Sequence, residues 1–188
     1  TVTNTNDAPF WTSVAIENAT EDEAYVYVLT GDDVDVNDNL HFTAVTAPDW
    51  LTIQADAGVF TLSGVPTNDD VGDHNVVIEL KDAAGASVNQ SFTVTVENTN
   101  DAPTFTSAPM VAATEDVEYV YAVQVEDIDL PAANIDVTLH GGAVGSTDWL
   151  ALEVDAAGQI TLRGTPTNSE VGDHEVQLRA NDGQASTV

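Results

Sequence analysis

Asn98-Thr-Asn-Asp-Ala-Pro103 decides how this chain is organised, because the same six residues stand at Asn4–Pro9. Further out, Thr20–Tyr27 and Thr114–Tyr121 share a Thr-Glu-Asp start and a Tyr-Val-Tyr end at the same separation. Self-similarity at a fixed period is the signature of tandem structural repeats. The sequence therefore predicts two copies of one module.

Each copy has the pattern of a β-domain. Apolar residues alternate with their neighbours across 25–29 and 92–96, which is typical of strands with one buried face. Glycines interrupt these short segments at turn-like intervals, and no segment has the apolar spacing of a helix. About seven short strands per copy predict an all-β protein made of two tandem Greek-key β-sandwich repeats.

The motif positions give the expected boundaries. Residues 1–3 match the tail of the first copy, so we expect them to end the last strand of a preceding repeat. Repeat 1 is expected over 4–97 and repeat 2 over 98–188, with 98–103 as the inter-repeat linker. The second copy has no counterpart of Ser91–Glu97, so we expect repeat 2 to lack its last strand and to expose an unpaired sheet edge.

The charge balance restricts the function. Three basic residues face 32 acidic ones, a net charge of −29. Nucleic-acid binding is excluded, because it needs a basic face. No apolar run is long enough for membrane insertion, and the absence of cysteine excludes disulfides and thiolate metal sites. The acidic residues are then either cation ligands or a hydrated surface suited to salt, since their repulsion opposes compaction.

The motifs in their order resemble a known family. Glu-Asp-x-x-Tyr-x-Tyr, Asp-x-Asp, Trp-Leu, Gly-x-Pro-Thr-Asn, Val-Gly-Asp-His and Asn-x-Asn-Asp-Ala-Pro are together similar to bacterial cadherin-like repeats of the dystroglycan type. The resemblance implies seven-stranded sandwiches with calcium at their junctions. It also implies a large bacterial adhesin, secreted or held on the cell surface, in which neighbouring repeats of the same chain are the first partners.

The resemblance also implies a set of calcium ligands. At the junction of the two repeats these are Glu21, Asn100, Asp101, Asp127, Asp129 and Asp182. Repeat 1 has the equivalent Asn6, Asp7, Asp33, Asp35 and Asp82 without a glutamate from a preceding repeat, so we expect that site to bind more weakly. The residue types agree, because calcium takes six to eight oxygen ligands. Alternate residues of a strand share a face, so Asp127 and Asp129 are expected to point the same way.

The number of ions is expected to be small. The second acidic motif of cadherins, Leu-Asp-Arg-Glu, is replaced by Pro66–Asp70 and Pro166–Glu170, which lack the arginine. One or two ions per junction are therefore expected, with Asp69 only a weak candidate. The alternative for each acid is a solvated turn residue, because aspartate and asparagine favour turns.

Other functions remain open from the sequence. A carbohydrate-binding module that recognises polysaccharide would need an exposed aromatic platform, for which Tyr25 with Tyr27 and Tyr119 with Tyr121 have suitable spacing. A cell-surface ligand and calcium-dependent self-association are further partners to consider. No enzyme is expected, because nearly every notable acid recurs in the other copy. His74 and His174 are expected in turns or packing rather than at a metal.

Overall fold

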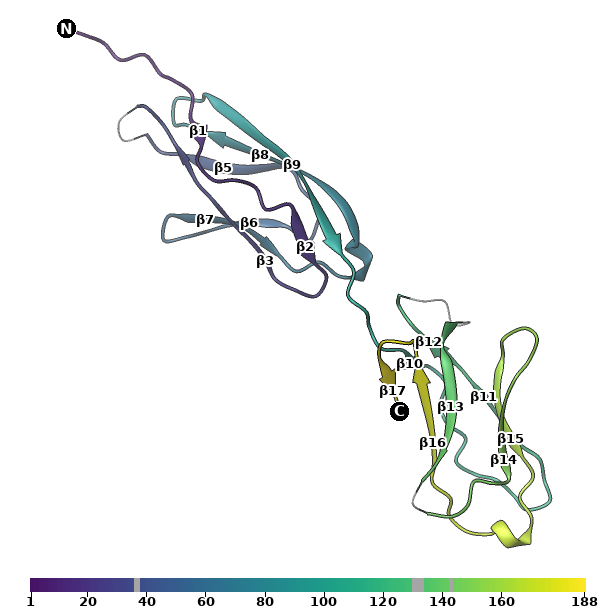
Figure 1. The fold of residues 1–188 in the computed structure, drawn as a ribbon. Coiled ribbons are helices and arrows are strands. Elements are labelled where there is room, and N and C mark those ends of the chain that lie inside the picture. The colour runs from purple at the N-terminus through teal and green to yellow at the C-terminus, as the bar shows by residue number, and fades with distance from the viewer. Residues whose placement is uncertain (36–37, 130–133, 143) are drawn as a thin grey trace. The chain divides into compact units, whose positions relative to one another are not determined.

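The chain forms two compact units, Thr1–Thr99 and Asn100–Val188, in a computed structural model that describes residues 1–35, 38–129, 134–142 and 144–188. Figure 1 shows that the regular elements of each unit are almost all strands. Within the described ranges no helix has the length and apolar character needed to cross a membrane. The all-β prediction is confirmed.

The first unit is a sandwich of two sheets, in which the strands pair antiparallel except for the parallel pair β2 and β9. One sheet has the order β3-β7-β6 and the other the order β2-β9-β8-β5, while β1 pairs with β4. Its elements are β1 Phe10–Trp11, β2 Asn18–Thr20, β3 Tyr25–Leu29, β4 Gly31–Asp32, β5 His41–Thr46, β6 Thr52–Asp56, β7 Val59–Gly64, the short 3-10 helix η1 Asn68–Asp70, β8 Gly72–Lys81 and β9 Ser87–Glu97. The chain crosses repeatedly from one sheet to the other, as a Greek-key sandwich requires.

Alternation along the strands builds the core of this unit. In β3 the side chains of Tyr25, Tyr27 and Leu29 are buried, whereas the intervening valines face solvent. Strand β7 lies between β3 and β6 and places Leu62 at the centre, with no exposed surface. The buried members of β8 and β9 close the core from the other sheet.

The second unit repeats this plan. Its sheets have the orders β11-β15-β14 and β13-β16-β17, while β10 pairs with β12. Its elements are β10 Thr104–Phe105, β11 Tyr119–Val123, β12 Val125–Glu126, β13 Asp136–Gly141, β14 Leu150–Val154, β15 Ile160–Gly164, the 3-10 helix η3 Asn168–Glu170, β16 Val176–Asn181 and β17 Ser186–Thr187. The described strands exceed seven per repeat because two-residue pairings such as β1 with β4 also count as strands.

The two units differ at their last strand. Strand β9 pairs with β8 from Ser87 to Val96, whereas β17 pairs with β16 only at Thr187 and Ser186. Within 100–188 no described residues correspond to the part of β9 that pairs with β8 from Ser91 to Val96.

Several recurring motifs have a structural role. A methyl group on Gly64 would meet the carbonyl oxygen of Trp50 at 1.8 Å, and one on Gly164 would meet that of Trp149 at 2.0 Å. The glycine of the Gly-x-Pro motif is therefore fixed by the backbone of the Trp-Leu motif, because only glycine permits so close an approach. This explains why both motifs recur without assigning them a ligand.

Candidate metal centre

The acidic residues of repeat 1 gather in the loops that follow two strands. Asp33 comes directly after β4, and Asp82 comes directly after β8. Carboxylate oxygens of Asp33, Asp38 and Asp82 all lie within 4.8 Å of one another. Asp82 is only 3 % exposed. The fold thus concentrates negative charge at one end of the sandwich.

Backbone N–H groups hold these carboxylates in place. Asp82 Oδ1 accepts hydrogen bonds from the N–H groups of Gly85 and Ala86. Asp38 Oδ1 accepts one from Ala83 at 3.1 Å, and Asp33 Oδ1 accepts one from Asp35 at 2.8 Å. The loops therefore orient the acids before any cation arrives, which lowers the cost of ordering them on binding.

The linker motif joins the same network. Asn6 Nδ2 donates to Asp82 Oδ2 at 2.8 Å and to the carbonyl oxygen of Asp7 at 2.9 Å. The N–H of Asp7 donates to Asp35 Oδ2 at 2.8 Å. All five residues predicted for repeat 1, Asn6, Asp7, Asp33, Asp35 and Asp82, are brought together in one hydrogen-bonded group.

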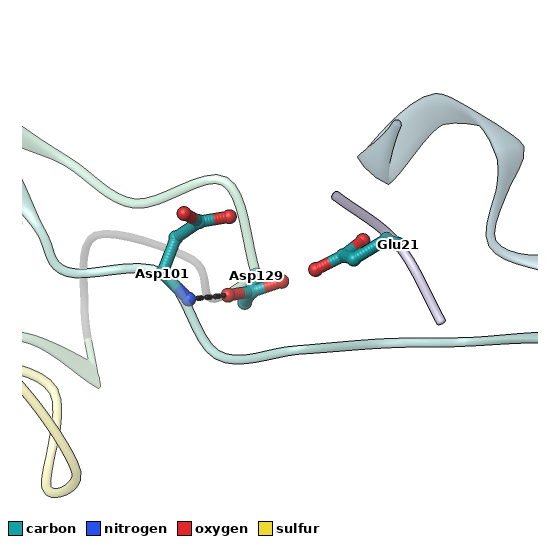
Figure 2. A group of neighbouring side chains, drawn as sticks. All are labelled: Glu21, Asp101 and Asp129. Atoms are coloured by element: carbon teal, nitrogen blue, oxygen red, sulfur yellow. Dashed lines mark hydrogen bonds between the residues drawn. The ribbon is translucent and has the colours of Figure 1, made fainter. Parts of the chain in front are cut away.

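Repeat 2 has the same four hydrogen bonds among its five equivalent residues. Asn100 Nδ2 donates to Asp182 Oδ2 at 2.9 Å and to the carbonyl oxygen of Asp101 at 2.8 Å. The N–H of Asp101 donates to Asp129 Oδ2 at 2.7 Å, as Figure 2 shows, and that of Asp129 to Asp127 Oδ1 at 2.8 Å. The five residues predicted for this repeat therefore also lie together.

A bend, not strand alternation, positions the Asp-x-Asp pair. Strand β12 ends at Glu126, so Asp127 and Asp129 lie beyond it, and the side chain of Asp127 accepts the N–H of Asp129. The expectation that the two carboxylates share a strand face is wrong, because a short aspartate side chain readily bonds the backbone two residues on. The pair is arranged by this local turn.

Hydrogen bonding favours the ionised form of Asp82 and of Asp182. The side-chain amide of Asn6, followed by backbone N–H groups of the next turn, holds the pKa of Asp82 below its usual range. The pKa of Asp182 is lowered by the N–H of Ala185 and then by Asn100. Both salt bridges between described residues use Arg163, so no basic side chain forms a salt bridge with either group there.

The spacing in repeat 1 fits a calcium ion. Three atoms no more than 4.8 Å apart fit on a circle of radius about 2.8 Å, the side divided by √3, against calcium–oxygen distances of about 2.3–2.6 Å. A contraction of a few tenths of an ångström would bring all three oxygens into contact with the ion. In addition, Asp33 Oδ2 is buried without a hydrogen-bond partner among the described residues.

Asp38 was missed by the sequence analysis. It lies five residues after Asp33, so the spacing Asp33-x-Asp35-x-x-Asp38 was the available signal. Comparison of the two repeats did not reveal Asp38, because repeat 2 has a different residue at the equivalent position. Strand β5 begins its pairing at His41, and Asp38 lies three residues before it. Strand β13 begins its pairing at Asp136, and Ala133 lies three residues before it. Ala133 lies outside the described residues, but its type shows that repeat 2 has no equivalent carboxylate at this position.

Glu21 has an unusual environment within the first unit. It is only 1 % exposed, and its Oε1 accepts the N–H of Thr99 at 2.8 Å. Its Oε2 is buried with no hydrogen-bond partner in the part of the chain that the structure describes. A buried carboxylate oxygen left unpaired is costly. Glu21 therefore holds the residue that immediately precedes Asn100, while its second oxygen accepts no hydrogen bond from a described residue.

The acids of the Pro-Thr-Asn turns are used differently. Asp70 and Glu170 each close a capping box, accepting the N–H and hydroxyl of Thr67 and Thr167. Asp69 is exposed and belongs to neither acidic group.

The aromatic residues do not form a sugar platform. Tyr25, Tyr27 and Tyr121 are buried in the cores, and the Tyr25 hydroxyl donates to the carbonyl oxygen of Ile16. The carbohydrate-binding alternative therefore finds no exposed platform in Tyr25 and Tyr27, because these side chains are the inward members of their strand. Trp50 packs edge-on against Tyr25.

Both recurring histidines serve packing and turns, as predicted. His74 Nε2 lies 2.6 Å from the carbonyl oxygen of Asp70, and His174 Nε2 lies 2.6 Å from that of Glu170. A carbonyl only accepts, so Nε2 carries the proton and is not a metal ligand. Each ring also packs edge-on against the tryptophan of its repeat.

Comparison with known proteins agrees with the fold. Residues 8–97 match the family model described as "Putative Ig domain". The chain is similar to the Protocadherin GammaB4 extracellular domain, with 19 % identity, a TM-score of 0.55, and coverage of 99 % of this chain and 32 % of that one. Protocadherin Gamma B2 extracellular cadherin domains 3-6 give 14 % identity, a TM-score of 0.57, and coverage of 92 % and 42 %. These likenesses show an Ig-like fold of the cadherin type.

An enzyme is also among the similar structures. The endo-fucoidan hydrolase MfFcnA4 from glycoside hydrolase family 107 has 25 % identity and a TM-score of 0.46, with coverage of 96 % of this chain and 27 % of that one. The chain thus spans about a quarter of that protein's length. No curated protein matches this chain.

Proposed function

We propose that this chain is a calcium-binding tandem-repeat segment of an extracellular adhesive protein. The observation that carries the proposal is the duplicated network. Two separately folded repeats use the same residue types and hydrogen bonds to hold a linker asparagine and aspartate against three further acids. A solvated turn needs no such agreement, whereas a structural ion site needs all its oxygens in place.

In repeat 1 the proposed ion binds Asp33, Asp38 and Asp82, with oxygens of Asn6, Asp7 and Asp35 nearby to complete its shell. The ion then neutralises carboxylates that otherwise repel one another in a chain of net charge −29. The weaker binding expected for this site rested on a missing glutamate. We propose instead that Asp38 replaces that charge, so that repeat 1 binds an ion with its own residues.

At the linker, the proposed ligands are Asn100, Asp101, Asp127, Asp129 and Asp182 of repeat 2, with Glu21 of repeat 1. Glu21 is included because its bonded oxygen holds Thr99, the residue joined covalently to Asn100, while its other oxygen is unpaired. An ion bound there would fix the linker to the end of repeat 2. One or two ions per linker are proposed, and their role is to stiffen the connection between neighbouring repeats.

Small-angle X-ray scattering with and without calcium tests this role. In chelator the linker is expected to flex, and in calcium the distribution of interatomic distances should narrow. Asp129→Asn should abolish the narrowing, whereas Asp155→Asn should preserve it, because the Asp155 side chain accepts N–H groups within its own turn between β14 and β15 and belongs to neither acidic group. An identical distribution with and without calcium would refute the proposed stiffening.

Adhesion and an extracellular location follow from the same proposal. Two of the similar structures with TM-scores above 0.5 are described as extracellular cadherin domains, and tandem domains with calcium-stiffened linkers suit a protein that must extend from a surface. The polysaccharide alternative is tested by retardation of the chain in a polysaccharide gel with calcium. Calcium-dependent self-association is tested by sedimentation velocity over a range of protein concentrations.

A further inference from the structure

One outer sheet face of repeat 1 carries almost no charge. On β3 the buried residues alternate with Val26 and Val28, which are 53 % and 47 % exposed. Antiparallel partners share a face, so the pairing of β3 with β7 and of β7 with β6 extends this surface across the sheet. The neutral face, as we call it, consists of Val26, Val28, Thr52, Gln54, Asp56, Val59, Thr61 and Ser63. Only Asp56, the last residue of β6, is charged.

The other sheet of the same repeat differs in charge. On β8 alone, Asp73, Glu79 and Lys81 point outward, because the alternate residues of this strand belong to the core. A chain of net charge −29 has acidic residues to spare for every exposed surface. A sheet face with half-exposed valines and one acid at its end is therefore an exception that needs a reason.

Repeat 2 carries a charged group on the equivalent face. Arg163 on β15 lies between two acids, with its Nη1 atom 3.9 Å from Glu118 Oε1 and its Nε atom 3.3 Å from Glu153 Oε2. The strand registers and the shared Thr-Glu-Asp motif identify the equivalent residues of repeat 1 as Ala24, Gln54 and Ser63. All three charges are therefore absent from repeat 1, so the neutral face is a property of that repeat and not of the fold.

We propose that the neutral face of repeat 1 binds the neutral face of a second copy of this chain. The contact is isologous, so the same patch serves both partners across a two-fold axis. The two sheets stack with their outward valines in contact, while the threonine, serine and glutamine side chains provide uncharged donors and acceptors around them. The inference goes beyond calcium binding and does not depend on it, because it concerns a different surface and a different kind of partner.

Charge selects a second copy as the partner. Two chains of net charge −29 repel each other, and that repulsion is smallest where neither presents a charged residue. A basic partner would instead be attracted to the acidic surfaces. Polysaccharide is not favoured either, because the neutral face contains no aromatic side chain on which a sugar could stack.

The size of the face predicts a weak dimer. Strands β3 and β6 have five residues each, so the face is about 17 Å long at 3.4 Å per residue and about 14 Å wide for three strands. The resulting area of about 240 Å² is well below the roughly 800 Å² per partner of a stable interface. Association is therefore expected to be reversible and to require high protein concentration.

NMR and sedimentation velocity of the full chain over a range of protein concentrations test the inference, at fixed calcium. Association should shift the amide signals of β3, β6 and β7 together. Sodium chloride should strengthen it, because screening reduces the repulsion between the two acidic chains. A contact between opposite charges would weaken with salt instead.

A matched pair of variants locates the surface. Val26→Asp should lower the association constant at least about tenfold, because it adds like charges to both sides of the contact. Val120→Asp makes the same change at the equivalent position of repeat 2, where the valine is also partly exposed, and should leave association unchanged. Near-UV circular dichroism checks that both variants keep the wild-type fold. Asp129→Asn, at the proposed linker ion site, should also leave association unchanged, so failure of the calcium proposal is distinguishable from failure of this one.

Three results would overturn the inference. The first is a chain that stays monomeric at high concentration in calcium and salt. The second is association that shifts amide signals outside β3, β6 and β7 but not within them. The third is an equal effect of Val26→Asp and Val120→Asp on the association constant.

Discussion

Asp38→Asn tests the proposed ion site of repeat 1 at a residue that has no counterpart in repeat 2. The substitution keeps the shape of the side chain and an oxygen that can still accept the N–H of Ala83. It removes one negative charge from the group of three carboxylates whose oxygens lie within 4.8 Å. The expected result is weaker calcium binding with little change in fold.

The magnitude follows from Coulomb's law. At the dielectric constant of water, a divalent cation about 2.5 Å from a carboxylate oxygen is stabilised by about 3.3 kcal/mol. The repulsion of Asp38 with its two neighbours at up to 4.8 Å is present with and without the ion, so it cancels in the difference between the two binding free energies. The loss of about 3.3 kcal/mol corresponds to roughly 250-fold weaker binding. A lower local dielectric constant would increase it.

The assay is a calcium titration followed by NMR, which separates the two repeats. The amides of Ala83 and Gly85 report on repeat 1, because they bond to Asp38 and Asp82, and those of Gln184 and Ala185 report on repeat 2. Asp38→Asn should weaken only the repeat-1 transition. The matched control Asp56→Asn makes the same charge change at an exposed site on β6. Equal affinities for wild type, Asp38→Asn and Asp56→Asn would refute the reasoning.

Three further predictions concern stability. Leu62→Ala should lower the free energy of unfolding by about 2–5 kcal/mol in chemical denaturation, because Leu62 is fully buried, while Val59→Ala, at an exposed site, should change it far less. Burial raises the pKa of Tyr25 to about 12, so the contribution of its protonated hydroxyl to the free energy of unfolding is complete below pH 10 and is lost as pH rises through 12. Tyr25→Phe should therefore reduce the loss of stability at alkaline pH in thermal melts. Hydrogen bonds from Thr167 lower the pKa of Glu170, so the contribution of its carboxylate to the free energy of unfolding is present above about pH 4.3 and declines below it. Glu170→Gln should therefore reduce the loss of stability at acid pH, measured by unfolding over a range of pH.

Much of the fold was predictable because the same sequence pattern occurs in both repeats. Alternation in β3 and β9, glycines between short segments and the duplicated linker predict two sandwiches. Long-range pairing was less accessible, because which strands become neighbours depends on packing between segments that are distant in the sequence.

The site was predictable where the two copies agree and obscure where they differ. Asn6 with Asp82 and Asn100 with Asp182 recur together, so comparison finds both pairs. Asp38 has no counterpart in repeat 2, and its role depends on loop geometry that sequence spacing alone does not give. For the tyrosines, alternation shows which residues share a face but not which face is buried, so the sequence alone left both core packing and an exposed platform open.

Thermal unfolding across a calcium titration, with magnesium and sodium chloride controls, tests the central claim most directly. A ligand that binds only the folded state stabilises it by about 2.7 kcal/mol at a hundred times its Kd. For domains of about 60–100 residues this raises Tm by roughly 10–20 °C, and the rise should be specific to calcium and reduced in Asp129→Asn. If sodium chloride alone produced the same rise, the acids would be a screened surface and the calcium sites would be contradicted.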